Sequence, residues 1–74
     1  MMTLDKGKVG KTLMIDGFLG DIDKINQRLL ELGFTQGQRV KIVAKSAMKK
    51  AVLLEIRGYL LSIRTSMLAN VVVK

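Results

Sequence analysis

The sequence predicts a mainly β domain with a single helix, and three observations support this fold class. Apolar and polar residues alternate along short segments of the second half, which is typical of strands with one buried face. One segment of the first half instead repeats apolar residues every three or four positions, as amphipathic helices do. The 74 residues, 49% hydrophobic and 26% charged, have the composition of one folded domain spanning 1–74.

The N-terminal elements are two strand segments and the helix. Residues 3–4 favour a brief edge segment, and residues 11–16 form a compact apolar run between glycines that favours a strand. Residues 21–32 are the helix, and its inward-facing residues are Ile22, Ile25, Leu29 and Leu32.

Both ends of this helix have residues suited to stopping it. Asp21 is the expected N-cap, because its carboxylate can accept from free backbone N–H groups of the first turn. Gly33 is expected in a left-handed conformation just past the helix, with Phe34 making the accompanying apolar contact. Gly37 then lies in a turn that leads into the next strand.

Strand patterns fill the second half. Residues 38–45 alternate, with Val40 and Ile42 facing inward, and a basic loop over 45–50 follows. Residues 51–57 alternate again, and their inward residues are Val52, Leu54 and Ile56. Gly58 is expected at the first central position of a type II′ hairpin turn.

The C-terminal segment completes a small sheet. Leu61 and Ile63 face inward, residues 65–69 form one helical turn, and residues 70–73 form a last strand. Short alternating strands bury their apolar faces when the sheet curls on itself. We therefore expect a small SH3-like β-barrel of about five strands, with the α-helix inserted between the first and second main strands.

Composition excludes most catalytic chemistry. The chain has no cysteine and no histidine, so thiolate nucleophiles, imidazole bases and the commonest metal ligands are missing. We expect no catalytic residue, no cofactor and no metal site. An N-terminus with early charges and a short C-terminal apolar run predict neither a signal peptide nor a membrane helix, and hence a cytoplasmic protein.

A net charge of +7 is the feature that indicates a partner. The cations on adjoining strands and their loop are expected to form one patch, with three apolar anchors at or beside it. These candidate partner-binding residues are Arg39, Lys41, Lys45, Met48, Lys49, Lys50, Leu53, Arg57 and Leu60. Such a patch suits nucleic acid, anionic lipid or an acidic protein surface, and a merely solvated face is the alternative. Aromatic residues are only 4%, which disfavours stacking on nucleic-acid bases.

One stretch resembles a known family. The segment LLELGFTQG at 29–37 is followed by VKIV at 40–43, RGY at 57–59 and LSIR at 61–64. This ordered combination resembles the bacterial FeoA family, the small cytoplasmic partner of the ferrous iron transporter FeoB. Where many members have a Pro-Leu-Gly-Asp-Pro-like loop, this chain has AMKKA at 47–51, so the loop is expected to be more basic and more mobile.

The resemblance implies an SH3-like barrel with an inserted helix and no enzymatic activity. It implies a supporting role in ferrous iron uptake by docking on the cytoplasmic region of a FeoB-type transporter, without direct membrane insertion. The fold is also similar to the C-terminal domain of metal-dependent iron repressors, and the family carries a transition-metal association that this histidine-free sequence does not support. The alternative is a small basic nucleic-acid-binding barrel or regulator-like domain.

Overall fold

The computed structural model describes residues 1–21 and 23–74, which form one antiparallel sheet of six strands and one α-helix. The helix, α1 (Lys24–Glu31), follows the second strand and precedes the third. The strands are β1 (Met2–Thr3), β2 (Thr12–Phe18), β3 (Arg39–Lys45), β4 (Ala51–Ile56), β5 (Tyr59–Arg64) and β6 (Val71–Val73). Three short 3₁₀ turns join them, namely η1 (Leu4–Lys6), η2 (Ala47–Lys49) and η3 (Thr65–Leu68). The predicted mainly β class with one helix is confirmed.

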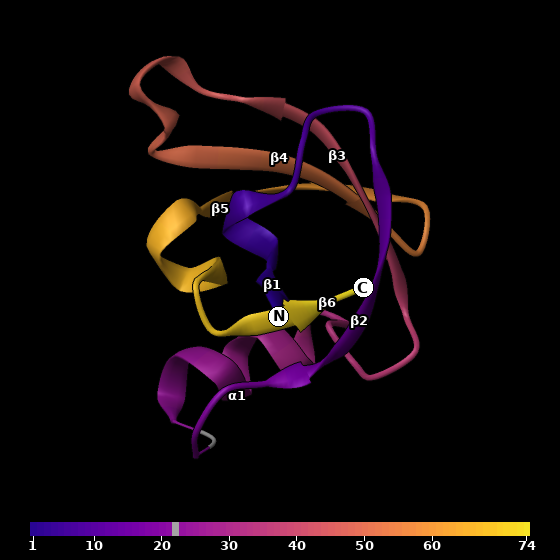
Figure 1. Ribbon diagram of the computed structural model, residues 1–74, viewed down its shortest axis with the longest axis vertical. Helices are drawn as coiled ribbons and strands as arrows, with labels where there is room; N and C mark the ends of the chain where they lie inside the picture. The colour runs from indigo at the N-terminus through magenta and orange to yellow at the C-terminus, as the bar shows by residue number, and fades with distance from the viewer. Residues whose placement is uncertain (22) are drawn as a thin grey trace.

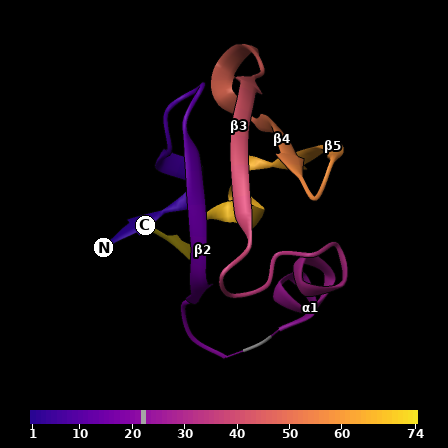
Figure 2. The same ribbon diagram turned by 90° about the vertical axis from the view of Figure 1, so that its right-hand side faces the viewer.

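The sheet order is β1-β6-β2-β3-β4-β5, so the first and last strands of the chain are neighbours. Met2 pairs with Val73, which brings the two termini together in the view of Figure 1. Figure 2 shows β2 and β3 side by side, with the β4–β5 hairpin and α1 on the same side of them. Among residues 1–21 and 23–74, β1 and β5 are not paired with each other. The sheet is therefore open, and closure into a barrel is not confirmed.

Two irregularities in strand pairing help the sheet to curl. The register shifts between Ile15 and Gly17 where β2 meets β6, and between Ile42 and Ala44 where β3 meets β4. An extra residue in one strand increases the local twist and bends the strand. The curved sheet encloses one apolar core, whose buried residues are Leu4, Ile15, Leu29, Phe34, Val40, Ile42, Val52, Leu54, Ile56, Ile63, Leu68, Val71 and Val73.

The start of the helix differs from the sequence prediction. Asp23, rather than Asp21, is the N-cap, and its carboxylate accepts from the backbone N–H of Asn26 at 2.8 Å. Asp23 has extended backbone angles, so the helix begins at Lys24, three residues later than expected. Asp21 instead offers its carbonyl oxygen to the Asn26 side-chain amide at 3.3 Å.

The buried face of the helix also differs from the sequence prediction. Ile25, expected in the core, is 47% exposed, whereas the polar Asn26 is buried in its place. Leu29 is buried as predicted and Leu32 is half-buried. The fourth expected core residue, Ile22, lies outside the described residues.

The end of the helix has the geometry of a Schellman motif. Gly33 has a φ of +106°, and its N–H donates to Leu30 O at 3.0 Å. The N–H of Phe34 donates to Leu29 O at 3.0 Å, and the Phe34 ring is buried. After this turn, Gly37 donates its N–H to Ile15 O at 2.8 Å, which fastens the approach to β3 onto β2.

The β4–β5 hairpin has a different turn from the one predicted. Ile56 pairs with Tyr59, so Arg57 and Gly58 are the two loop residues, and both have positive φ, +53° and +83°. Positive φ at both positions defines a type I′ turn and not type II′. Arg57, expected as the outward end of a strand, is therefore part of the turn.

Candidate functional site

The loop between β3 and β4 is held by a small hydrogen-bond network. Ser46 accepts on its hydroxyl from Ala51 N at 2.9 Å and on its carbonyl from Lys49 N at 2.8 Å. The Thr65 hydroxyl donates to Lys49 O at 2.7 Å, which connects the loop to η3. Met48 and Lys49 have positive φ, +64° and +55°, although neither is glycine. The loop is thus bonded at its base while Met48 at its tip is 83% exposed.

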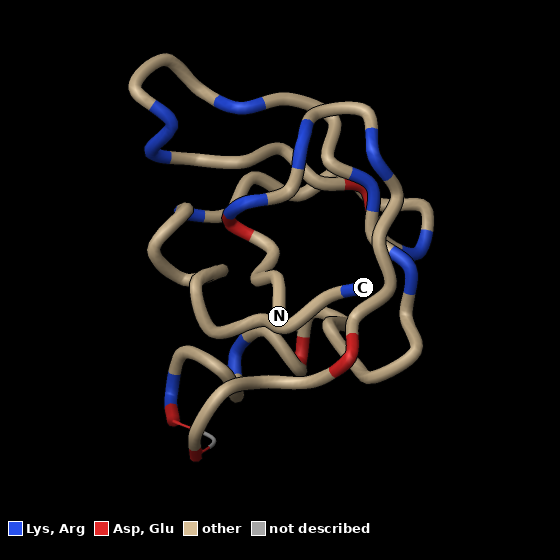
Figure 3. Tube along the Cα trace, viewed as in Figure 1, with Lys and Arg blue, Asp and Glu red and all other residues tan. Residues whose placement is uncertain are grey.

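Three cations meet at the base of this loop. Lys49, Lys50 and Arg64 line a hollow of about 600 Å³ together with Ala51, Thr65 and Ser66. The register that pairs Ala51 with Arg64 brings the end of β5 to the loop. Arg64 was not among the residues selected from the sequence, because only the strand pairing places it beside the two lysines. Figure 3 shows the β3–β4 loop with basic positions and no acidic ones. We call Lys49, Lys50 and Arg64 the loop cluster.

A second group lies on the outer face of β3, β4 and β5. Lys41, Glu55 and Leu60 are cross-strand neighbours in consecutive strands. The next row of this face contains Leu53 between its partners Ala44 and Ser62. Leu60 is 62% exposed, and Leu53 is half-buried. A shallow hollow of about 280 Å³ beside Leu53 is also lined by Lys45, which connects this face to the loop.

The remaining two predicted cations line other hollows. Arg57 is in the turn at the far end of β4 from the loop cluster, where it lines a hollow of about 360 Å³ with Glu31, Leu32, Tyr59 and Leu61. Arg39 starts β3 opposite Met14 and lines a separate hollow with Lys74. Arg39 is exposed two residues before Lys41 and so shares its face of β3, whereas Arg57 lies in the turn. The sequence pattern did not reveal that Arg39 and Arg57 both lie at the end of the β3–β4 pair away from the loop, because that follows from the pairing of Val40 with Ile56.

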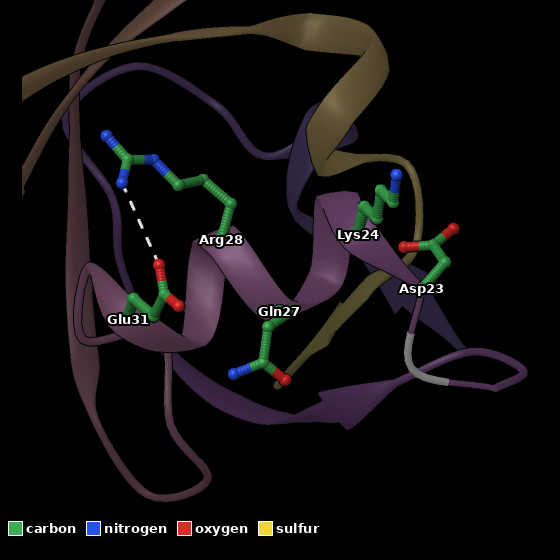
Figure 4. Close-up of a pocket in the computed structure, with 5 residues that line it drawn as sticks. All are labelled: Asp23, Lys24, Gln27, Arg28 and Glu31. Atoms are coloured by element: carbon green, nitrogen blue, oxygen red, sulfur yellow. Dashed lines mark ion pairs between the residues drawn. The ribbon is translucent and has the colours of Figure 1, made fainter.

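The exposed side of α1 forms another hollow, of about 520 Å³, shown in Figure 4. Its lining residues all come from one helix and its cap: Asp23, Lys24, Gln27, Arg28 and Glu31. Arg28 Nη1 and Glu31 Oε1 are 3.7 Å apart, and both side chains are more than half exposed. An exposed ion pair of this kind contributes little, and a surface built by one helix encloses no ligand. We do not assign a function to this face.

Residues 1–21 and 23–74 contain no cluster of side chains suited to binding a metal ion. No three His, Cys, Asp or Glu side chains gather there in a way that could hold a metal ion. Of the helices in the same residues, none has the length and apolar character needed to cross a membrane.

Comparison with known proteins decides the family. The model of the FeoA domain matches residues 2–74, which is nearly the whole chain. The chain belongs to the FeoA family. This family is linked to ferrous iron transport. Among curated protein sequences, no significant match is found.

Solved structures of FeoA proteins have the same fold. A FeoA-like protein from Clostridium acetobutylicum matches with a TM-score of 0.90 and 23% identity over 99% of this chain and 84% of its own. FeoA from Stenotrophomonas maltophilia, solved with zinc, matches with a TM-score of 0.86 and 30% identity over 100% and 91% of the two chains. That protein is described as a prokaryotic SH3 domain protein and a candidate activating factor of ferrous iron transport.

A manganese-dependent transcriptional repressor shares the fold at a TM-score of 0.81 and 13% identity, over 95% of this chain and 39% of its own. The similarity to repressors expected from the sequence is therefore present at the level of the fold. The Stenotrophomonas relative was solved as a zinc complex, whereas this chain has no histidine and no cysteine.

Proposed function

We propose that this chain is a non-enzymatic accessory protein of ferrous iron uptake that docks on the cytoplasmic part of a FeoB-type transporter. Membership of the FeoA family supports the link to iron transport. The description of the Stenotrophomonas relative as a candidate transport-activating factor supports an accessory role. Docking on a cytoplasmic region places the protein in the cytoplasm.

The observation that carries the proposal is the outer face of β3–β5 with its adjoining loop. Leu60 and Met48 are large apolar side chains exposed to solvent, and Leu53 lies half-buried between them. Cations border this surface, with Lys45 beside Leu53 and Lys41 across Glu55 from Leu60. Apolar anchors with a charged rim are typical of protein-binding surfaces, and the charges indicate an acidic partner.

A calorimetric titration tests this docking. The chain is titrated with the cytoplasmic domain of the FeoB-type transporter from the same organism, and we expect a dissociation constant of tens of micromolar or tighter, on the order of −6 kcal/mol or more favourable. Leu60→Ser should weaken binding by about tenfold, because it removes an exposed apolar anchor. Val9→Ser is the matched control, since Val9 is 55% exposed outside this surface. No heat at these concentrations, or equal losses in both variants, would contradict the proposal.

Nucleic-acid binding is the second candidate, and the loop cluster is the observation that favours it. The aromatic residues do not support it, because Phe34 is buried, Phe18 is half-buried, and the exposed Tyr59 lies at the opposite end of β5 from the loop cluster. Titration with mixed-sequence DNA or RNA at two salt concentrations separates the candidates. Affinity that falls steeply with salt and is lost when Lys45, Lys49 and Lys50 become glutamate would favour nucleic acid.

A further inference from the structure

β5 has a free edge in the described part of the chain. All six of its residues pair with β4, and Ile56–Tyr59 closes the two-residue turn. In such a hairpin the pair next to the turn exchanges both hydrogen bonds, and bonded pairs alternate from there. Tyr59, Leu61 and Ile63 therefore bond to β4, whereas the N–H and C=O groups of Leu60 and Ser62 point away from it. Neither residue makes another backbone hydrogen bond among residues 1–21 and 23–74.

This edge lacks the usual protections against added strands. Natural edge strands are blunted by proline, by a bulge, by central charges or by being very short. The register of β4 with β5 runs without a shift, the chain contains no proline, and the outward residues Leu60 and Ser62 are uncharged. β1, at the opposite edge of the sheet, has only two residues. β5 is thus the edge of this sheet that is long enough to accept another strand.

A hollow lies next to the first half of this edge. This hollow has a volume of about 360 Å³, and it is lined by Leu32 at the end of α1 and by Tyr59 and Leu61 of β5. Tyr59 is 69% exposed, and both leucines are half-buried. Side chains of an added strand alternate between the two faces of the sheet, so one opposite the first half of β5, on the side of Tyr59 and Leu61, would be directed toward this hollow. Leu32, Tyr59 and Leu61 favour an apolar side chain at that position, and Glu31 and Arg57 complete the lining.

Cations mark both ends of β5. Arg57 precedes the strand and lines the hollow, and Arg64 ends it within the loop cluster. Arg28 extends from α1 and pairs with Glu31 at 3.7 Å, as Figure 4 shows. Glu55, opposite Leu60, is the acidic residue on the outer face. A partner segment with negative charges at its two ends would match these arginines.

We propose that the β5 edge receives an extended segment of the partner protein, which adds to the sheet as a further strand. The segment is apolar at alternate positions and acidic at both ends. A second copy of this chain is disfavoured, because antiparallel pairing of two β5 strands would bring Arg57 of each copy close to Arg64 of the other, between chains of net charge +7. The inference rests on the proposed docking and specifies its mode.

Hydrogen exchange tests the edge directly in the unaltered protein. The amides of Leu60 and Ser62 are followed by NMR, alone and with two probes, namely the cytoplasmic domain of the transporter and a synthetic nine-residue peptide of alternating valine and threonine with aspartates at both ends. We expect exchange at these two amides to slow by about tenfold or more with each probe. The same peptide with lysines at its ends is the control and should leave both amides unchanged.

Two substitutions of Ser62 distinguish the contribution of its backbone N–H to binding from that of its side chain. Ser62→Pro removes the outward N–H without breaking a bond to β4, whereas Ser62→Ala keeps that N–H and changes the side chain only slightly. We expect Ser62→Pro to weaken the affinity for both probes by about tenfold or more. The Ser62→Ala variant should bind both probes with the affinity of the original chain. Thermal melting shows whether the proline variant is folded. If it is not, the exchange measurement decides alone.

The outcomes are distinguishable. Binding of the transporter domain without protection of Leu60 and Ser62 overturns strand addition and leaves the proposed function standing. Protection by the acidic peptide with no binding of the transporter domain supports the acceptor edge and contradicts the proposed function. Protection that grows with the concentration of the chain alone, together with a dimer in sedimentation, overturns the acidic partner in favour of a second copy. No protection with either probe overturns the inference.

Discussion

The aliphatic stem of Arg57 lies over Gly33, so that a Cβ atom added to Gly33 would be 3.0 Å from Arg57 Cδ. Both residues have positive φ, Gly33 at the end of α1 and Arg57 in the β4–β5 turn. The contact joins the helix C-terminus to the hairpin at the border of the hollow beside β5. The end of the helix and the hairpin turn therefore depend on each other.

Replacement of Gly33 is expected to destabilise the fold strongly. Gly33→Val should cost about 3 kcal/mol, because a β-branched residue must adopt φ near +106° and also meet Arg57. Gly33→Ala should cost about 1–2 kcal/mol. Chemical denaturation measures both. Adding Arg57→Ala to Gly33→Ala should recover the steric part of the cost, and purely additive losses would show that the contact has no energetic role.

The two aspartates before the helix should differ in importance. Asp23→Ala removes the side chain that accepts from Asn26 N at 2.8 Å and should cost about 1 kcal/mol. Asp21→Ala keeps the backbone carbonyl that Asn26 uses and should stay within about 0.5 kcal/mol of the original. Thermal melting of both variants measures the two losses of stability. A larger loss for Asp21→Ala than for Asp23→Ala would indicate that Asp21 is the N-cap.

Gly7 is predicted to be intolerant of any side chain. A Cβ atom there would collide with Ile42 Cδ1 and lie 2.9 Å from Leu13 Cδ1. Gly7→Ala should therefore cost about 1–3 kcal/mol through overpacking. Ile42→Val removes the colliding methyl group, so in the Gly7→Ala background it should be neutral or stabilising, although alone it costs about 1 kcal/mol. If Ile42→Val does not restore the stability of the Gly7→Ala variant, the collision with Ile42 is not the cause of its destabilisation.

Asn26 is buried in the helix, and its amide nitrogen donates to Asp21 O at 3.3 Å. Its Oδ1 has no hydrogen-bond partner among the described residues. Asn26→Asp puts a carboxylate oxygen against that carbonyl in a dry site and should cost about 3 kcal/mol at neutral pH. Asn26→Ala, which removes both polar atoms, should cost less in urea denaturation. Equal stability of the two variants would mean that water reaches this site.

Charge reversal in the loop cluster should slow association with the transporter domain. Lys49→Glu with Lys50→Glu should lower the on-rate by about tenfold at low salt, because steering toward an acidic surface is lost. Lys8→Glu with Lys24→Glu changes the net charge equally at exposed positions away from the cluster. Stopped-flow measurements at two ionic strengths compare the pairs. Equal slowing by both would attribute the effect to total charge and not to the cluster.

Periodicity predicted the strands and core well, because burial of one sheet face leaves a direct alternation in the sequence. Val40, Ile42, Val52, Leu54 and Ile56 were expected inside and are buried. The helix was predicted less accurately. Asp21 and Asp23 are both suitable caps, and pattern alone does not distinguish them. Ile25 was expected in the core and is 47% exposed, because the spacing of apolar residues gave no sign that the polar Asn26 would be buried.

The sequence by itself determined the class of fold, the family and the positive charge, since these depend on residue types and their local spacing. Only the tertiary structure decided where the charges lie. Pairing of Ala51 with Arg64 formed the loop cluster, and the short turn sent Arg57 to the other end of the hairpin. The free edge of β5 was likewise set by sheet order, because strand pairing brings together residues whose separation along the chain carries no sign of their contact.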